Sequence, residues 1–490
     1  MKRLLLTCVI AFVVMLCTVM AGYTSDNEHP IDLERVFYLF NMLDGLLDAD
    51  DGYLWGSPLH GPVVFVCAAT RFAAANMPVL LGEILEKYEP LGLYVGIIPD
   101  GVIISDTISE FGGRVWGMVV WSESFIDETD NAMRLLIHEL FHAWQFGGLF
   151  IGNPFSSNNT HADGLDARIS ILLEINALLY ALRTDGDERT SAIVDALSIR
   201  AERRRQSGAI ARNENIVEVM EGLAVYTDTV LRRDSSEDRI AEIELYAISW
   251  LNGSMPMQFF GYATGALYAL LLDEVGADWR SGGIRWNADL GAILRQTIGL
   301  GITDLVPFSD IDLELYGYSY IRQIQEAWVL ENERIVREAQ AAFSGPVLLL
   351  CRDGVIDWYD PNLDIIARFI PWPDFYGSGI YELDYGLEGI ILRDDMRGFD
   401  WLVNIGTFVY TADFGRLEVA GGVMMFIGRT IHRHEVPAYG IEIDGNTVTG
   451  SGWTLTLNNG FYIRTVGGVH FAIGGEAGDE PQGYKYNLNP

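Results

Sequence analysis

The stretch from Leu135 to Gln145 constrains this chain more than any other, because it sets charged and metal-binding side chains into an apolar helix. It contains the pattern HExxH, formed by His138, Glu139 and His142. Side chains four positions apart lie on one face of an α-helix, so both imidazoles can bind one metal ion, with the Glu139 carboxylate beside it. The neighbours that indicate a buried helix are Met133, Leu136, Ile137, Leu140, Phe141 and Trp144.

Burial of this Glu–His set requires compensation, which a bound metal provides. The pattern therefore favours a zinc site in which Glu139 deprotonates a water activated by the metal. The alternative is a core helix that carries two hydrogen-bonded histidines.

The composition indicates a folded and strongly acidic protein. The chain has 490 residues, 49% of them hydrophobic, which is enough for two or three domains with complete cores. The net charge is −34, and lysine occurs only at positions 2, 87 and 485. Such a surface repels nucleic acid and anionic lipid, so neither is expected as a partner.

The N-terminus predicts an export signal over residues 1–21. A basic start precedes an apolar run that reaches about Val19, and Ala21 completes a signal-peptidase site. We therefore expect an exported protein, extracellular, at the cell surface or in the periplasm, without stable membrane insertion after cleavage. An uncleaved N-terminal anchor is the alternative. The mature chain would contain Cys67 and Cys351, either as one disulfide or as two buried thiols.

The rest of the chain predicts an α+β part, residues 22–343, followed by an all-β part, residues 344–490. Short apolar runs separated by Gly, Pro or Asp predict a small, mainly antiparallel sheet over residues 50–125, with strands at Val63–Cys67, Phe72–Asn76, Leu93–Ile98, Val102–Ser105 and Val115–Trp121. Helical periodicity dominates residues 130–343 and predicts helices at about 31–47, 130–146, 165–183, 187–209, 213–231, 258–275 and 318–343. Alternating β-branched and aromatic residues after 344 predict a sandwich or barrel.

Two details of the helical part can be checked directly. Asp130 is the expected N-cap of the HExxH helix. The run of Arg200, Arg203, Arg204 and Arg205 in the helix 187–209 is interpreted as a solvated face rather than an anion site.

A zinc site needs a third protein ligand besides the two histidines. Gln145 and Gly148 stand where metzincins have Gly and His, which excludes that class. The best candidate is Glu221, because Val217, Ala224 and Val225, three of its helical neighbours three and four positions away, are apolar. An acid on such a face is rare unless it is paired or bound to metal.

Other acids could support or replace Glu221. Glu218 lies one helical turn earlier. It is expected to orient a metal ligand by a hydrogen bond without binding the metal itself. Glu174 is an alternative ligand or a second orienting residue, and Asp163 and Asp166 are weaker alternatives.

Glu221-Gly222-Leu223-Ala224 after HExxH resembles the gluzincin zinc metallopeptidases. Their aminopeptidase-N-like members pair HExxH with a later Asn-Glu-Gly-Phe-Ala; here Met220 stands at the position of the Asn. Tyr262-Ala-Thr-Gly265 is similar to the Tyr-x-x-Gly on their next helix. His142 and Glu221 are farther apart than is usual there, and an inserted helical pair over 165–209 accounts for the difference.

The chain as a whole also resembles a group of exported bacterial proteins, in segments that cover most of the mature chain: Tyr53–Gly56, His138–Gln145, Leu173–Leu178 and Glu221–Thr227. This second resemblance implies no substrate. The first implies a zincin-like catalytic domain with thermolysin-like and aminopeptidase-N-like chemistry, hydrolysing peptide bonds in a peptide or protein substrate. The zinc ligands that it implies are His138, His142 and Glu221.

In the implied mechanism Glu139 is the general base and Tyr262 stabilises the oxyanion. By analogy, the strand Trp116–Trp121 would bind substrate in an extended form. Two other functions stay open: a non-catalytic surface or binding protein on a degenerate zincin fold, and a zinc hydrolase of non-peptide substrates. Retention of Glu139 with both histidines favours an active enzyme, since a dead site can lose its base without structural penalty.

Overall fold

The computed structural model describes most of the chain between residues 29 and 474. The described ranges are 29–342, except 69, 100, 103, 123–125, 127, 152–158, 206, 252–256 and 282, and then 347–351, 389–394, 399–412, 415–427, 433–438, 440–466 and 469–474. The expected signal peptide, residues 1–21, lies outside them. The chain divides into two compact units, with the boundary in the sequence between Val329 and Leu330.

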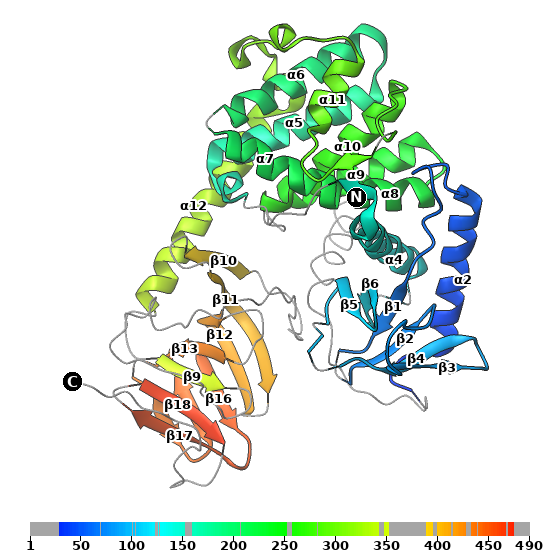
Figure 1. Ribbon diagram of the computed structural model, residues 1–490. Coiled ribbons are helices and arrows are strands. Elements are labelled where there is room, and N and C mark those ends of the chain that lie inside the picture. The colour runs from blue at the N-terminus through cyan, green and yellow to red at the C-terminus, as the bar shows by residue number, and fades with distance from the viewer. Residues whose placement is uncertain are drawn as a thin grey trace. The chain divides into compact units, whose positions relative to one another are not determined.

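The first unit contains a six-stranded sheet (Figure 1). Its strands follow the order β3-β4-β2-β1-β6-β5, and all neighbours are antiparallel except β1 and β6. The strands are β1 (Val63–Val66), β2 (Phe72–Ala75), β3 (Leu85–Tyr88), β4 (Leu93–Ile97), β5 (Thr107–Phe111) and β6 (Arg114–Val120). The predicted mixture of helices with a mainly antiparallel sheet is therefore confirmed at this coarse level.

One predicted strand is wrong. Val102, Ile104 and Ser105 are not in a strand, because the Val102 N–H closes a turn onto the Pro99 carbonyl and the Arg71 guanidinium donates to the Val102 carbonyl. The strand at this position is β5, which begins later and pairs with β6 through Thr107 and Met118. The short strand β3 was not predicted, because only Leu85 among its four residues is buried.

The helices of the first unit follow the sheet in the chain and, apart from α2 in front of it, make up its helical part (Figure 1). They are α2 (Leu33–Asp50), α4 (Thr129–Trp144), α5 (Leu165–Arg183), α6 (Gly186–Arg204), α7 (Gly208–Val217), α8 (Leu223–Arg232), α9 (Ser236–Leu251), α10 (Gly261–Glu274), α11 (Leu290–Thr297) and the first part of α12 (Tyr318–Ala342), which continues into the second unit after Val329. Two π-helical turns extend α4 and join α7 to α8: η1 (Gln145–Leu149) and η3 (Glu218–Gly222).

Three helix predictions require correction. The predicted helix 187–209 ends earlier than expected: α6 stops at Arg204 and α7 begins at Gly208, because Ser207 caps α7 and its hydroxyl accepts a hydrogen bond from the Ala209 N–H. Helices α9 and α11 were not predicted. The N-cap of α4 is Glu128 rather than Asp130, whose carboxylate instead pairs with Arg232 and Arg233.

Helix α4 lies between the sheet and the other helices (Figure 1) and packs against β6 and α8. Gly117 of β6 permits this contact: a Cβ atom there would come within 2.7 Å of the backbone carbonyl of Glu139. A side chain at this position would therefore push away the turn of α4 that carries HExxH. Trp116, also on β6, is fully buried and stacks on Phe111 of β5 at a centroid distance of 5.1 Å.

The described residues of the second unit, beyond the end of α12, form strands. They make one ten-stranded sheet whose main path is β14-β15-β16-β12-β13-β9-β18-β17, with β11 between β10 and β12. The strands are β9 (Val347–Cys351), β10 (Gly389–Asp394), β11 (Phe399–Ala412), β12 (Gly415–Ile427), β13 (Arg433–Pro437), β14 (Glu442–Asp444), β15 (Thr447–Gly450), β16 (Trp453–Leu457), β17 (Phe461–Val466) and β18 (Val469–Gly474).

Two further sequence predictions bear on the molecule as a whole. Cys67 is a buried free thiol within the first unit. Among the described residues, none of the helices has both the length and the apolar content that crossing a membrane requires.

Candidate metal centre

The two histidines of HExxH lie on one face of α4, one helical turn apart. Their side chains are only 12% (His138) and 10% (His142) exposed. The helix forms here because its buried positions are filled by large apolar side chains, including Leu136, Leu140 and Phe141. Packing of these side chains fixes the rotation of α4, and the histidine face then points toward the helices that follow in the chain.

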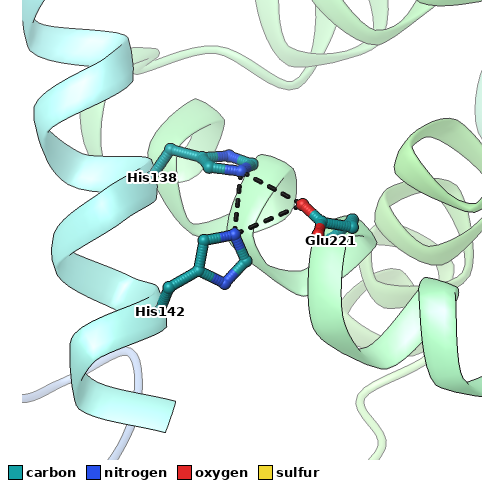
Figure 2. Close-up of side chains that lie close together, drawn as sticks. All are labelled: His138, His142 and Glu221. Carbon is teal, nitrogen blue, oxygen red and sulfur yellow. Dashed lines mark hydrogen bonds and ion pairs between the residues drawn. The ribbon is translucent and has the colours of Figure 1, made fainter. Parts of the chain in front are cut away.

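Glu221, from the π-helical turn η3, meets the two histidines (Figure 2). The three atoms that face one another are His138 Nε2, His142 Nε2 and Glu221 Oε2, at pairwise distances of 3.1, 3.2 and 3.4 Å. Zinc held at 2.0–2.1 Å in a tetrahedral site separates its ligand atoms by about 3.3 Å. The two imidazoles and one carboxylate therefore have the chemistry and the spacing of a three-ligand zinc site.

The other ring nitrogen of each histidine faces an oxygen. His138 Nδ1 lies 3.5 Å from Asp228 Oδ2, and His142 Nδ1 lies 2.9 Å from Gln145 Oε1. These partners favour a proton on Nδ1, which leaves the Nε2 lone pair directed at the shared point. Sequence reasoning missed both residues. Asp228 could have been found as an acid two helical turns after Glu221 on the same helical face.

Charges within the cluster shift the titration of its members. Burial lowers the pKa of His138, but hydrogen bonds to Asp228 and Glu221 outweigh it and raise the pKa to about 10. Burial also opposes the charged form of His142, and Glu221 again raises the pKa. The pKa of Glu221 is lowered despite burial, because both histidines stabilise its carboxylate. The Glu221 carboxylate therefore stabilises positive charge on the two histidines or on a cation bound between them.

Glu139 lies beside the three ligands and is 4% exposed. Its Oε2 is buried and has no hydrogen-bond partner among the described residues. Burial raises the pKa of Glu139, and the charges of His142 and His138 offset part of the shift. A buried carboxylate oxygen without a donor is costly, and it is an acceptor available to a proton from a water molecule.

Tyr262, on α10, reaches the same site. Its ring is stacked with that of His138 at a centroid distance of 6.0 Å, with an angle of 6° between the planes. The pKa of Tyr262 is raised well above its usual range by burial, by the charge of Glu221 and by the hydrogen bond that joins its phenol to that carboxylate. The phenol therefore keeps its proton and can donate a hydrogen bond.

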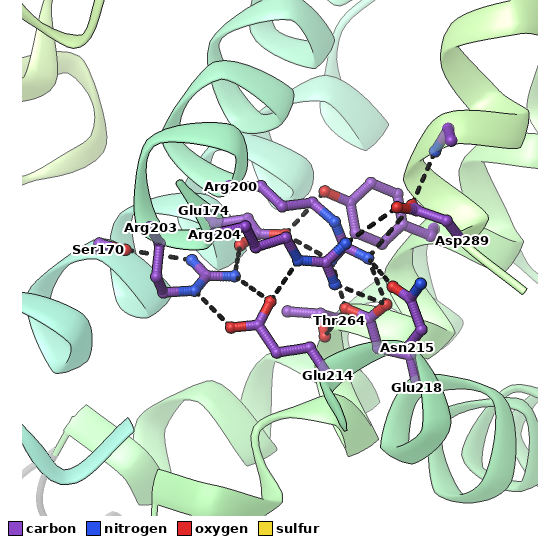
Figure 3. Close-up of polar contacts among 12 residues, drawn as sticks. Ser170, Glu174, Arg200, Arg203, Arg204, Glu214, Asn215, Glu218, Thr264 and Asp289 are labelled. Carbon is purple, nitrogen blue, oxygen red and sulfur yellow. Dashed lines mark hydrogen bonds and ion pairs between the residues drawn. The ribbon is translucent and has the colours of Figure 1, made fainter. Parts of the chain in front are cut away.

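The two acids expected to orient the ligands, Glu218 and Glu174, bind arginine instead (Figure 3). Both carboxylates are fully buried. Glu218 accepts from Arg200 Nη2 at 2.5 Å and from the Thr264 hydroxyl at 2.8 Å. Glu174 accepts from Arg200 Nη1 at 3.1 Å. Neither makes a described contact with the three ligand atoms, and Asp163 and Asp166 are likewise outside the group that could hold a metal.

The interpretation of the arginine run as a solvated face is wrong for three of its four members. Arg200, Arg203 and Arg204 have side chains 3%, 3% and 8% exposed, whereas Arg205 is 77% exposed. Their partners come from other parts of the chain, which a charge pattern along one helix does not reveal. These partners are Glu174 on α5, Glu214 on α7, Glu218 on η3 and Asp289 at the N-cap of α11.

The strand proposed by analogy to bind substrate is not at an edge of the sheet. Over Arg114–Met118, β6 pairs with β5 on one side, and over Gly117–Val120 it pairs with β1 on the other. Beyond the last pair with β5, the Val120 N–H donates a hydrogen bond to the Asp106 carboxylate at 2.8 Å. The edge strand next to β6 is β5, so at this end of the sheet an extended ligand would add beside β5 rather than beside β6.

Comparisons of the chain with models of protein families, with curated proteins and with solved structures gave no match. The function must therefore be inferred from the chemistry of the site itself.

Proposed function

We propose that this protein is an exported zinc-dependent peptidase of the gluzincin type, with Zn²⁺ held by His138, His142 and Glu221. The observation that carries the proposal is the triangle of two imidazole nitrogens and one carboxylate oxygen, with sides of 3.1–3.4 Å. This donor set is typical of zinc sites that keep one position open for water or substrate.

Held by His138, His142 and Glu221, a zinc ion would lower the pKa of a water molecule to about 7 and polarise the substrate carbonyl group. Glu139 then accepts the proton of the attacking water on its buried Oε2 and delivers it to the leaving amine. The Tyr262 phenol donates a hydrogen bond to the carbonyl oxygen on which negative charge develops, an interaction worth about 3–4 kcal/mol in comparable sites. Its raised pKa ensures that this hydrogen is present at neutral pH.

The finer fold assignments belong to the same proposal: a zincin-like domain for residues 22–343 and an all-β sandwich or barrel for residues 344–490. So does export, which rests on the N-terminal sequence alone. The acidic composition favours peptide or protein substrates over nucleic acid.

The test combines metal content with hydrolysis. The purified wild-type chain is expected to contain one equivalent of zinc by elemental analysis and to cleave members of a peptide library read by mass spectrometry. Glu139→Gln should keep the zinc and lose about 10²–10⁴-fold in rate, because the amide cannot accept the proton. A wild-type protein without zinc would contradict the proposal. Zinc with no peptide cleavage, but cleavage of ester substrates, would identify a non-peptide hydrolase.

A second test addresses the third ligand. Glu221→Ala is expected to abolish tight zinc binding, while Glu174→Ala should leave the zinc stoichiometry unchanged because its carboxylate binds Arg200 and Arg203. The measurement is zinc affinity by competition with a chromophoric chelator. Loss of zinc only in Glu174→Ala would refute Glu221 as the ligand.

A further inference from the structure

The amide of Gln145 links the two separate parts of the chain that supply the metal ligands. This side chain is 1% exposed and lies at the junction of α4 and η1. Its Nε2 donates to the backbone carbonyls of Val219 at 2.9 Å and Met220 at 3.2 Å, both in η3. Its Oε1 lies 2.9 Å from His142 Nδ1.

The orientation of this amide follows from its partners. Backbone carbonyls only accept hydrogen bonds, so the group facing Val219 and Met220 must be the NH₂. The oxygen of Gln145 consequently faces His142, and an amide oxygen accepts a hydrogen bond but cannot donate one. The contact at Nδ1 is therefore made by an N–H of His142. In the neutral ring, the Nε2 lone pair then points toward His138 and Glu221.

The other half of the amide acts on the third ligand. Glu221 follows Val219 and Met220 directly in η3. This turn has π-helical bonding, in which the Leu223 N–H donates to the Glu218 carbonyl five residues earlier. Such turns shift the usual hydrogen-bond register and need outside partners to hold their carbonyls. The Gln145 amide, at the end of α4, supplies this hydrogen-bond donor to the Val219 and Met220 carbonyls. Met220 stands where the gluzincin motif that this segment resembles has Asn.

We propose that Gln145 is a positioning residue of the metal centre: it orients His142 for binding through Nε2 and fixes η3 so that Glu221 meets both histidines. This inference rests on the proposed zinc site. It assigns Gln145 no contact with the metal or with substrate. Its effect passes entirely through His142 and through the backbone of η3.

The test compares Gln145→Met, Gln145→Glu and Gln325→Met in the full-length chain. Methionine fills the space without either hydrogen bond, whereas glutamate restores an oxygen that can accept from His142 Nδ1. Gln325 is a matched control, since its fully buried amide also joins two segments, accepting from Arg168 and donating to the Leu251 carbonyl. Circular dichroism checks that each variant is folded.

The readouts are the zinc dissociation constant, from chelator competition, and the visible spectrum of the Co²⁺-substituted protein, which reports ligand geometry. Gln145→Met is expected to weaken zinc binding by about 10–100-fold and to shift the Co²⁺ bands. Gln145→Glu should recover part of the affinity, and Gln325→Met should match the wild type in both readouts.

Two outcomes would overturn the inference alone: a zinc affinity of Gln145→Met within threefold of the wild type, or an equal loss in Gln325→Met. If Gln145→Met does not fold, the comparison between Gln145→Glu and the wild type decides, and an unchanged Co²⁺ spectrum and affinity there would refute the role. A wild-type protein that binds no zinc would overturn the proposed function, and this inference with it.

Discussion

His138 and His142 present the same nitrogen, Nε2, to the candidate centre, and in both cases the residue facing Nδ1 explains why. For His142 this is the neutral amide of Gln145, and for His138 it is the carboxylate of Asp228. A carboxylate also increases the basicity of the ring that it faces. The two ligands are thus supported in different ways, and the loss of either support should be measurable separately.

Asp228→Asn tests the support of His138. The substitution removes the negative charge next to His138 Nδ1. It also weakens the interaction with Arg232, whose Nη2 donates to Asp228 Oδ1 at 2.8 Å in the wild-type protein. We expect the zinc dissociation constant to rise about 10-fold or more. Asp273→Asn serves as the control, since that carboxylate pairs with Arg280 and Tyr226. Equal zinc affinities for the wild type and Asp228→Asn would show that the carboxylate has no role.

At the scale of single elements, the position of α4 depends on a strand that contributes no ligand. Gly117 lets β6 approach the backbone of α4 at Glu139, the residue that follows His138. The sequence marks this strand as buried and apolar but does not show that a side chain is forbidden at position 117. That restriction arises only when the helix is packed on the sheet.

Gly117→Ala is expected to lower the free energy of unfolding by about 1–3 kcal/mol, because the added Cβ must displace either β6 or α4. Gly45→Ala is the control, since a Cβ in the exposed middle of α2 would meet nothing within 4 Å. There the free energy of unfolding should rise by about 0.5–1 kcal/mol, as alanine favours a helix over glycine. Denaturant unfolding measures both. A neutral Gly117→Ala would mean that the close approach is easily relieved.

At the scale of the whole first unit, the interior holds a network of arginines and acids that joins α5, α6, α7, η3 and α11. The chain has a net charge of −34 with only 33 basic residues, and several of these are withdrawn from the surface into the network. Buried ion pairs lose much of their attraction to desolvation, but removal of one partner leaves an uncompensated charge. The network therefore makes the packing of these helices sensitive to pH.

The pKa of Glu214 indicates in which direction stability should change with pH. Burial raises the pKa of Glu214, but the charges of Arg203 and Arg204 and a hydrogen bond to His161 outweigh it, so the pKa is well below the usual 4.5. A carboxyl group with a depressed pKa contributes stability above pH 4.5, and this contribution is lost as the pH falls toward the folded-state pKa. The wild-type protein should consequently lose stability progressively below about pH 4.5.

Glu214→Gln should reduce the free energy of unfolding at pH 7 by about 3–5 kcal/mol, because Arg203 and Arg204 each lose one of their carboxylate partners. It should also flatten the decline between pH 4.5 and lower values, since the group that titrates is gone. Glu244→Gln, at an exposed pair with Arg183, should change stability by less than about 1 kcal/mol. Denaturant unfolding at several pH values gives the answer, and parallel pH profiles for wild type and Glu214→Gln would contradict it.

Local patterns in the sequence were sufficient for most elements. The period of buried residues predicted α5 at its observed bounds, Leu165–Arg183, and predicted α4 within two residues. The break between α6 and α7 was predicted a few residues too late, although Ser207 was available as a cap. Helix α9 was missed despite a similar signal, in which the Ser235 hydroxyl accepts from the Asp238 N–H.

The spacing of His138, Glu139 and His142 was enough to place them on one buried helix, and the same kind of spacing indicated Glu221 as an acid on an apolar helical face. These conclusions depend on spacing of a few residues, which helical geometry converts directly into proximity. The packing of separate elements was needed to show that Asp228 and Gln145 face the histidines, that Glu218 binds Arg200, and that Arg200, Arg203 and Arg204 are buried. Each of those contacts joins separate elements, and their packing, rather than any local period, selects which polar groups meet.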